Sequence, residues 1–431
     1  MLTPDVLLVA SDPLAPPVWS AVPFAGLLLC IAALPLVAPE WWHSNRNKAI
    51  VSCAFGIPVG IYAAFRDPAS LAHTALEYLA FVSLLGSLYV ISGNIVIRGS
   101  LPGTPASNTL LLAGGALLTN LVGTTGAAML LIRPFLKANR NRPSRVHQVV
   151  FFILIVANCG GCLTPLGDPP LFLGFLKGVP FEWTLRLWKE WLLLLGCLLA
   201  CFYLLDRRLL RSSPPEAATE GPGEPVRIAG KANIALLVGV IGVVLAGGFL
   251  IHPRYGETAA QLFQSGALGA LAVVSLISTP KTLRQENEFS WHPYLEVAIL
   301  FAGIFTAMIP ALSILRTLGP SLGISKPWQF FFMTGGLSAF LDNAPTYLAF
   351  LSLAQNFPDE VAGTTHRILQ SISSGSVFFG ALTYIGNGPN FMVKAIAEHR
   401  GVKMPSFFGY LGWSLSFLGP VLLIIALLFF R

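Results

Sequence analysis

The chain has 431 residues, of which 54% are hydrophobic and only 11% are charged. A soluble domain normally carries about 25% charged residues, so this composition excludes an ordinary soluble protein. Several apolar stretches reach the roughly 20 residues that a helix needs to cross a bilayer. The sequence therefore predicts an all-α polytopic membrane protein whose surroundings are the lipid bilayer.

The charge balance and the cysteines indicate no nucleic acid and no resident cofactor. Loops that orient a membrane protein explain the net charge of +7, and no basic cluster is interleaved with aromatic residues. Cys159 and Cys162 have CxxC spacing, but no second Cys or His cluster accompanies them, so we expect packing residues rather than a metal or redox site. No GxxxxGKS loop occurs, which argues against ATP-driven pumping by this chain alone.

Apolar runs predict the elements in chain order. The first half, 1–206, contains spans at 20–38, 48–65, 71–97, 146–177 and 189–206 and a re-entrant hairpin at 106–136. A linker at 207–231 is too polar to span and is expected to be flexible and cytoplasmic. The second half, 232–431, contains spans at 232–251, 257–279, 291–317, 366–398 and 405–430 and a hairpin at 327–356.

The two halves resemble each other along much of their length. At one constant spacing Thr164 matches Thr383, and neighbouring glycines, prolines and phenylalanines match as well. The hairpins align at a slightly longer spacing, which sets the Thr-Asn pair at 119–120 against the Asp-Asn pair at 342–343. Because each half has five full spans, an odd number, we expect the second half to be an inverted repeat of the first.

Charge placement predicts the orientation in the membrane. With the N-terminus outside, most Lys and Arg residues fall in segments on the inner side, such as 137–145 and 207–211. The positive-inside rule then places both termini outside, with the first hairpin entering from the cytoplasm and the second from outside. The expected location is the inner (plasma) membrane of a bacterium.

Two spans are interrupted by residues that a regular helix does not hold. The first break is Thr164-Pro-Leu-Gly-Asp-Pro-Pro170, and the second is Thr383-Tyr-Ile-Gly-Asn-Gly-Pro389. Irregular backbone at membrane depth is tolerated only where protein buries it or a cavity adjoins it. Matched broken helices of this kind indicate the midplane binding site of a secondary transporter.

Few ionisable residues fall inside the spans, and these are functional candidates by default. Asp168 lies in the first break and Asp342 at the second hairpin tip, so each half contributes one carboxylate. A carboxylate that binds either a proton or Na⁺ provides the competition that exchange requires. The expected ion or substrate site comprises Asp168, Asp342, Asn120, Asn343, Thr119, Thr164, Thr383, Asn387, Thr124 and Thr346, with Glu77, Glu296, Asn158 and Asn390 as weaker candidates.

Structural roles stay open for these candidates. Asp168 and Asp342 can also cap the N-termini of half-helices, and the Asn and Thr side chains can satisfy broken backbone. Glu77 and Glu296 begin apolar spans, where a position at the membrane surface is the plainer interpretation. Four histidines near span ends are expected to be solvated: His147, His252, His292 and His399.

Short motifs carry a resemblance to a known family. Ser338-Ala-Phe-Leu-Asp-Asn-Ala-Pro-Thr346 resembles the SAxLDNxPT hairpin motif of the ion transporter superfamily, which contains arsenite permeases, NhaD-type sodium/proton antiporters and CitM-type citrate carriers. Segments 119–129 and 158–170 resemble the matching motifs of the first half. The chain is most similar to the NhaD- and CitMHS-like members.

The resemblance implies a scaffold domain, a transport domain with two opposed hairpins, and Na⁺ near the hairpin tips. Members are often homodimers that work by an elevator-like motion, so a homodimer is an expected assembly. The dicarboxylate branch has Ser-Asn-Thr at both hairpin tips, whereas this chain has Thr119-Asn120-Leu121 and Asp342-Asn343-Ala344. The acidic tip residue favours a cation as the transported species.

We therefore expect a secondary active transporter rather than an enzyme, and first of all a sodium/proton antiporter. The alternative is a cation-coupled carrier of citrate, another carboxylate or a small oxyanion, because half-helix N-termini bind anions without any Arg. A third hypothesis is a channel or a membrane receptor. The sequence shows no soluble output domain, which argues against it.

Overall fold

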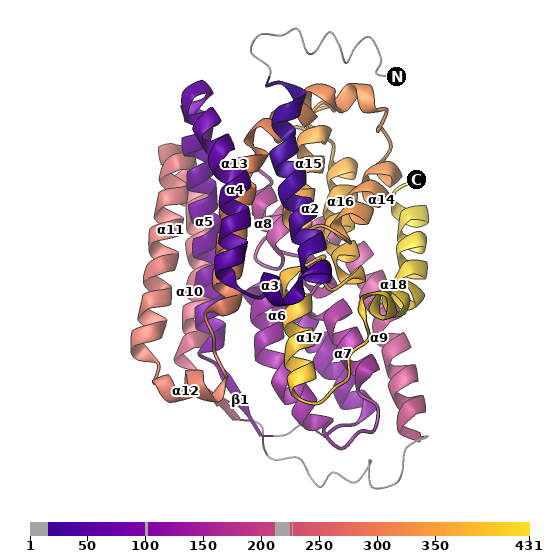
Figure 1. The fold of residues 1–431 in the computed structure, drawn as a ribbon. Helices are drawn as coiled ribbons and strands as arrows, with labels where there is room; N and C mark the ends of the chain where they lie inside the picture. The colour runs from indigo at the N-terminus through magenta and orange to yellow at the C-terminus, as the bar shows by residue number, and fades with distance from the viewer. Residues whose placement is uncertain (1–15, 100–101, 212–224, 226) are drawn as a thin grey trace.

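The computed structural model describes residues 16–99, 102–211, 225 and 227–431. Within these ranges the protein is almost entirely helical, and seven helices are long and apolar enough to cross a membrane. The predicted all-α polytopic membrane protein is confirmed by these helices. The described chain starts and ends toward the same end of the helical bundle (Figure 1).

The order of elements is similar in the two halves. The first half forms η1 (Val18–Ala21), α2 (Val22–Val37), α3 (Pro39–Trp42), α4 (Asn45–Arg66), α5 (Pro68–Gly93), β1 (Val96–Arg98), α6 (Pro105–Ala138), α7 (Val146–Ile155), η2 (Cys159–Cys162), α8 (Pro169–Leu176), η3 (Phe181–Leu187) and α9 (Trp188–Arg211). The second half forms β2 (Arg227–Ala229), α10 (Ala232–Ala246), η5 (Gly247–Ile251), α11 (His252–Ser278), α12 (Lys281–Glu286), α13 (His292–Leu318), η6 (Gly319–Leu322), α14 (Pro327–Ser338), α15 (Asn343–Ala354), α16 (His366–Phe379), η7 (Gly380–Leu382), α17 (Gly388–His399) and α18 (Phe407–Phe429).

Element α6 consists of two antiparallel arms. Gly123 interrupts the helix with a φ of 77°, a backbone conformation that a side chain strongly disfavours. Asn108 near the start of α6 and Asn139 just after its end exchange hydrogen bonds of 2.8 and 2.9 Å, so the arms run back along each other. A Cβ on Gly115 in the first arm would meet the side chain of Leu131 in the second. In the second half, α14 and α15 form two such arms as separate helices.

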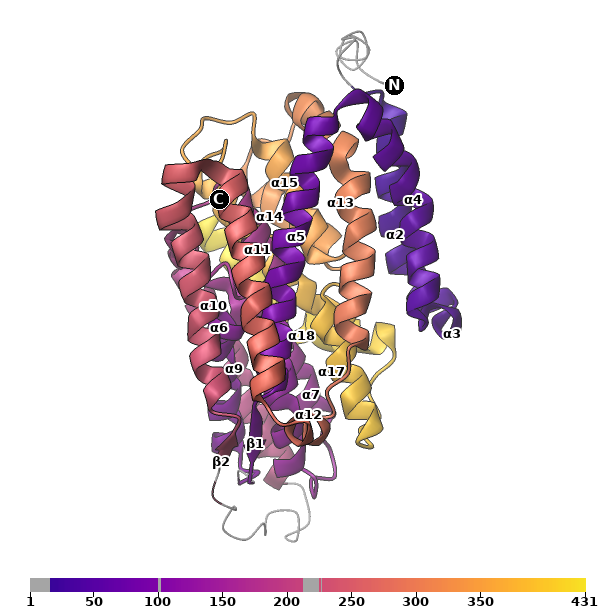
Figure 2. The ribbon, with the colours of Figure 1, turned by 90° about the vertical axis from the view of Figure 1, so that its left-hand side faces the viewer.

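The helices form two groups. In one group α4 packs against α13 and α11 packs against α5, together with α2 and α10. The other group contains α6, α14–α15, the broken helices, α9 and α18. The helices α5 and α13 lie where the groups meet, because α5 contacts α6 and α13 contacts α15 (Figure 2).

A short antiparallel sheet joins the linker to the end of α5. Val96 pairs with Ala229, and Arg98 pairs with Arg227. Helix α9 continues to Arg211, so the linker predicted at 207–231 is regular structure at both ends. Polar composition could not show this, because the strand pairing depends on a partner far away in the sequence. The rest of the linker, 212–224 and 226, lies outside the described residues.

A buried polar network closes the open end of the two α6 arms. Asp206 of α9 is fully buried and accepts hydrogen bonds from Asn108 at 3.0 Å and Gln148 at 3.1 Å. His147 lies 2.8 Å and Arg142 3.4 Å from the same carboxylate. The prediction that His147 is solvated is therefore wrong: its ring faces this network from the start of α7 and is buried.

Replacing Asp206 by Ala would remove the shared acceptor of Arg142 and His147. Breaking a buried ion pair in this way typically costs about 3–5 kcal/mol. We expect a clearly lower Tm for Asp206→Ala in detergent, followed by intrinsic tryptophan fluorescence. Asp359→Ala, at an exposed position, is the matched control and should change Tm little. Equal Tm values for the two variants would contradict a stabilising role of the network.

Candidate functional site

The two broken helices meet at their breaks. Asn158, just before η2, donates through Nδ2 to Oδ1 of Asn390 at 2.6 Å. Asn387, just before α17, donates to Oδ1 of Asn158 at 3.1 Å. Asn390 also donates to the carbonyls of Gly380 and Thr383, at 2.9 and 2.8 Å. These amides provide partners for backbone groups that lack a helical one, which irregular backbone at membrane depth requires.

Glycines let each break fold tightly. A Cβ on Gly161 would meet the carbonyl oxygen of Gly167 at 2.6 Å. A Cβ on Gly386 would meet the carbonyl oxygens of Gly380 at 2.6 Å and of Ser338 at 2.8 Å. Such distances are shorter than van der Waals contact, so only a residue without a side chain fits there.

The tip of α6 is docked onto the first break. Asn120 donates to the carbonyl of Gly160 at 2.8 Å and accepts from the backbone N–H of Leu163, also at 2.8 Å. The hydroxyl of Thr164 donates to the carbonyl of Asn120 at 2.5 Å. The backbone N–H of Thr124 donates to Gly167 at 2.9 Å. Asn120 and Thr164 thus fix the tip to the break through backbone groups.

The second half repeats two of these contacts. The hydroxyl of Thr383 donates to the carbonyl of Ala339, and the N–H of Asn343 donates to Gly386 at 3.2 Å. Each lies 219 residues after its counterpart, the spacing that also separates Asp168 from Asn387. By these contacts Asn343 corresponds to Thr124, whereas the sequence alignment of the hairpins set it against Asn120. The similar Thr-Asn and Asp-Asn pairs shifted that alignment by about one helical turn.

Asp168 lies where the tips and the breaks come together. It is the residue before α8, and its side chain is buried, with 1% exposed. Its Oδ1 accepts from the hydroxyl of Thr124 at 2.9 Å and from Nδ2 of Asn387 at 3.0 Å. Its Oδ2 accepts from Nδ2 of Asn343 at 2.6 Å. One carboxylate is therefore bound by three segments that are far apart in the sequence.

The donors to Asp168 are all neutral. Among the described residues no Lys, Arg or His forms an ion pair with this carboxylate. A carboxylate offers about four lone-pair sites, so three donors leave one site for a further partner. Burying a charge without a counter-charge is unfavourable, and therefore an ionised Asp168 favours the binding of a proton or a metal cation.

A small void adjoins the carboxylate. Its volume is about 20 Å³, and it is lined by the tip residues Gly123 and Thr125, by Leu84 and Leu88 of α5, and by Asp168 itself. A space of roughly 10–15 Å³ on this measure holds one water molecule. The void can therefore hold one water molecule or one ion of similar size, but not a tricarboxylate.

Asp342 takes a different place from Asp168. Its Oδ1 accepts from the backbone N–H of Ala344 at 3.0 Å, so it caps the N-terminus of α15. Its carbonyl accepts from the hydroxyl of Thr346 at 2.9 Å. The carboxylate is only partly buried. The capping role that the sequence left open is thus present, while the next residue, Asn343, reaches Asp168.

The remaining candidates have other partners. The hydroxyl of Thr119 donates to Ala116 within its own arm of α6, at 2.6 Å. Glu296 pairs with Lys48 at 2.7 Å, and Glu77 pairs with Lys177 at 2.6 Å. In the part of the chain that is described, neither glutamate contacts the Asp168 cluster.

Sequence reasoning missed the side chains that surround Glu77. His73 and Glu257 lie beside it, on α5 and α11. The spacing of four residues between His73 and Glu77 on an expected helix was the available signal, since such residues lie on one face. No local pattern pointed to Glu257, which comes from the other half of the chain.

The chain matches the family model described as "Putative citrate transport" over residues 14–430. It belongs to this family. The match covers both hairpins and both breaks, so the predicted resemblance to CitMHS-like members of the ion transporter superfamily is confirmed. The protein is accordingly a secondary transporter of the membrane. A comparison with curated proteins gives no match.

The tight approach of the breaks in this transporter can be tested with one methyl group. Gly386→Ala would push Cβ against two backbone carbonyls, and overpacking of this kind typically costs about 1–3 kcal/mol. We expect a lower Tm in detergent. Gly412→Ala is the matched control, because nothing lies within 4 Å of its Cβ and Ala favours a helix. The same fall in both variants would contradict the close approach.

Proposed function

We propose that this protein exchanges Na⁺ for H⁺, with Asp168 as the group that binds either ion. The observation that carries the proposal is a buried carboxylate held by three neutral donors beside a void of about 20 Å³. Such a site lacks one positive charge. A proton or Na⁺ supplies it, and because one carboxylate cannot hold both, the two ions compete.

Asn343 can form a hydrogen bond with Asp168 in both its ionised and its protonated state. Its Nδ2 donates to Asp168, while its Oδ1 is buried and has no hydrogen-bond partner. In the ionised state Nδ2 donates to the carboxylate, and Na⁺ would bind to Asp168 in the adjoining void, which Asn343 does not line. In the protonated state a 180° turn of the amide lets Oδ1 accept the proton of Asp168. The same side chain therefore serves both protonation states of Asp168, as a donor or as an acceptor.

We further propose that the two halves are inverted repeats related by an axis near Asp168. The recurring contacts at a spacing of 219 residues support this, and so do two contacts between equivalent positions: Asp168 with Asn387, and Cys159 with Phe378. Equivalent residues touch each other only near a symmetry axis. An inverted pair gives the scaffold from which alternating access develops. The N-out, C-out orientation in a bacterial plasma membrane belongs to this proposal.

A second candidate function is a cation-coupled carrier of citrate. The family description supports it, and a cavity of about 1210 Å³ among α5, α8, α11 and α13 is lined by Arg66, Lys177 and Arg316. This cavity is somewhat larger than a typical small-molecule site of about 300–1,000 Å³, so a citrate molecule would fit in it. The first candidate is preferred because the small void and the unpaired carboxylate at Asp168 suit a cation and repel an anion.

Transport in proteoliposomes tests the proposal. With an imposed pH gradient followed by a pH-sensitive dye, added Na⁺ should dissipate the gradient in the wild type. Asp168→Asn should abolish the response, because a neutral amide neither takes up the proton nor supplies the negative charge that holds the cation. Its Tm should remain near that of the wild type, and Asp359→Asn is the matched active control. Labelled citrate uptake without any Na⁺ or Li⁺ response would overturn exchange in favour of the second candidate.

Asp342→Asn separates capping from charge. Asn caps a helix about as well as Asp, so α15 should keep its start and the protein its Tm. If the charge of Asp342 takes part in ion binding, Na⁺-dependent dissipation of the pH gradient should fall at least ten-fold. Full activity in this variant would restrict Asp342 to its capping role at Ala344.

A further inference from the structure

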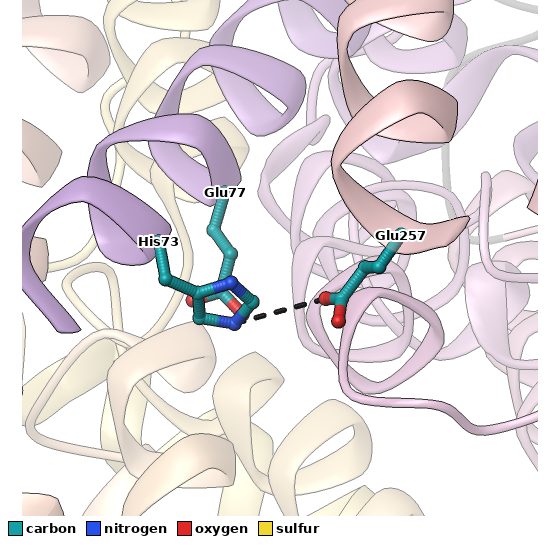
Figure 3. A group of neighbouring side chains, drawn as sticks. All are labelled: His73, Glu77 and Glu257. Atoms are coloured by element: carbon teal, nitrogen blue, oxygen red, sulfur yellow. Dashed lines mark ion pairs between the residues drawn. The ribbon is translucent and has the colours of Figure 1, made fainter. Parts of the chain in front are cut away.

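A second group of ionisable side chains lies at the far end of α8 from Asp168. His73 and Glu77 of α5 and Glu257 of α11 point toward one another (Figure 3). Nε2 of His73 lies 3.1 Å from Oε1 of Glu77 and 3.7 Å from Oε1 of Glu257. One ligand atom from each residue lies within 4.8 Å of the other two.

The local sequence explains this convergence. His73 and Glu77 are one helical turn apart and therefore share a face of α5. On α11, Gly256 has a φ of 84°, so the regular helix that carries Glu257 begins only after this kink. Helices α5 and α11 pack along each other, which brings the three side chains together from the two halves of the chain.

Gln261, a neighbour of Glu257, has a side-chain oxygen without a hydrogen-bond partner. Gln261, one turn after Glu257, donates through Nε2 to Oε1 of Glu257 at 3.0 Å. The residue is buried, with only 3% exposed, and its Oε1 has no hydrogen-bond partner. Gln261, His73 and Glu257 line the cavity of about 1210 Å³. A buried carbonyl oxygen without a donor, on a side chain hydrogen-bonded to Glu257, indicates a missing partner at this end of the cavity.

The ammonium group of Lys177 supplies one positive charge near these carboxylates. Nζ of Lys177 lies 2.6 Å from Oε1 of Glu77, and Lys177 also lines the cavity. Within the described ranges it is the one lysine or arginine that pairs with this group. Among the described residues its ion pair is with Glu77, so Glu257 forms an ion pair only with His73, at 3.7 Å.

We propose that His73, Glu77 and Glu257 bind a divalent transition-metal ion, and that Gln261 turns its amide to add an oxygen donor. Bonds of roughly 2.1 Å at tetrahedral angles separate two ligands by about 3.4 Å, which is close to the 3.1 and 3.7 Å found here. One imidazole and two carboxylates suit Zn²⁺, Mn²⁺ or Co²⁺ better than Mg²⁺, which prefers oxygen ligands and water.

The metal and Lys177 compete for Glu77. A metal ion bound to Glu77 repels the ammonium of Lys177, which directly follows α8. Metal binding therefore releases this end of α8 from α5, while the other end begins beside Asp168. The metal site does not depend on the exchange proposal, because it rests on different residues and is tested by binding rather than by transport.

Zn²⁺ titration of the purified full-length protein in detergent tests the site, with isothermal calorimetry as the readout. We expect the wild type to bind Zn²⁺, and His73→Ala and Glu257→Gln to bind it at least ten-fold more weakly. His399→Ala, which removes an exposed histidine, is the control and should bind like the wild type. Metal-free Tm values close to that of the wild type show that the variants are folded.

Lys177→Ala makes the test specific. Removing the competing ammonium should strengthen Zn²⁺ binding several-fold, whereas Lys189→Ala, at an exposed position, should leave it unchanged. Adventitious binding at surface groups would give equal affinities in His73→Ala and His399→Ala, and this result would overturn the site. Unchanged or weaker binding in Lys177→Ala would overturn the competition at Glu77.

Discussion

A carboxylate charge inside a membrane protein constrains everything around it. Asp168 has no cationic partner in the described chain, and it is held by neutral donors from the tip of α6, from the start of α15 and from the second break. All three segments must reach the same point, so both hairpin tips and both breaks have to be packed closely. The glycines of the breaks and the docking of Asn120 and Thr164 serve this convergence.

Both groups of helices contribute to the packing around Asp168. Within one group, the network around Asp206 fixes the open end of the α6 arms, far from the tip. The other group contributes α5 and α13, which cover the hairpins from the side. A small void near Asp168 lies where α5 meets the α6 tip. A cavity over fifty times larger lies on the far side of α8, between the groups.

The sequence predicted much of this, because its strongest signals are local. Apolar runs predicted the helices, and Pro and Gly predicted the breaks that place Asp168, Asn387 and Thr124 together. What depends on distant partners could not be predicted. His147 is buried because its ring nitrogen pairs with Asp206, which lies 59 residues away in the sequence. The hairpin alignment was shifted by one turn. The Thr-Asn and Asp-Asn pairs look alike in sequence, but they do not make equivalent contacts. The sequence left open whether Asp342 caps a helix, and the cap at Ala344 became visible only in the geometry.

Three helices begin at the buried carboxylate: α8 just after Asp168, α17 just after Asn387, and α15 at Asn343. Each helix start carries a partial charge of roughly +0.5. This positive field stabilises the ionised carboxylate, so it weakens the hold of Asp168 on a proton or Na⁺. A carboxylate without a Lys or Arg partner among the described residues is thereby kept from binding its ion too tightly to release it.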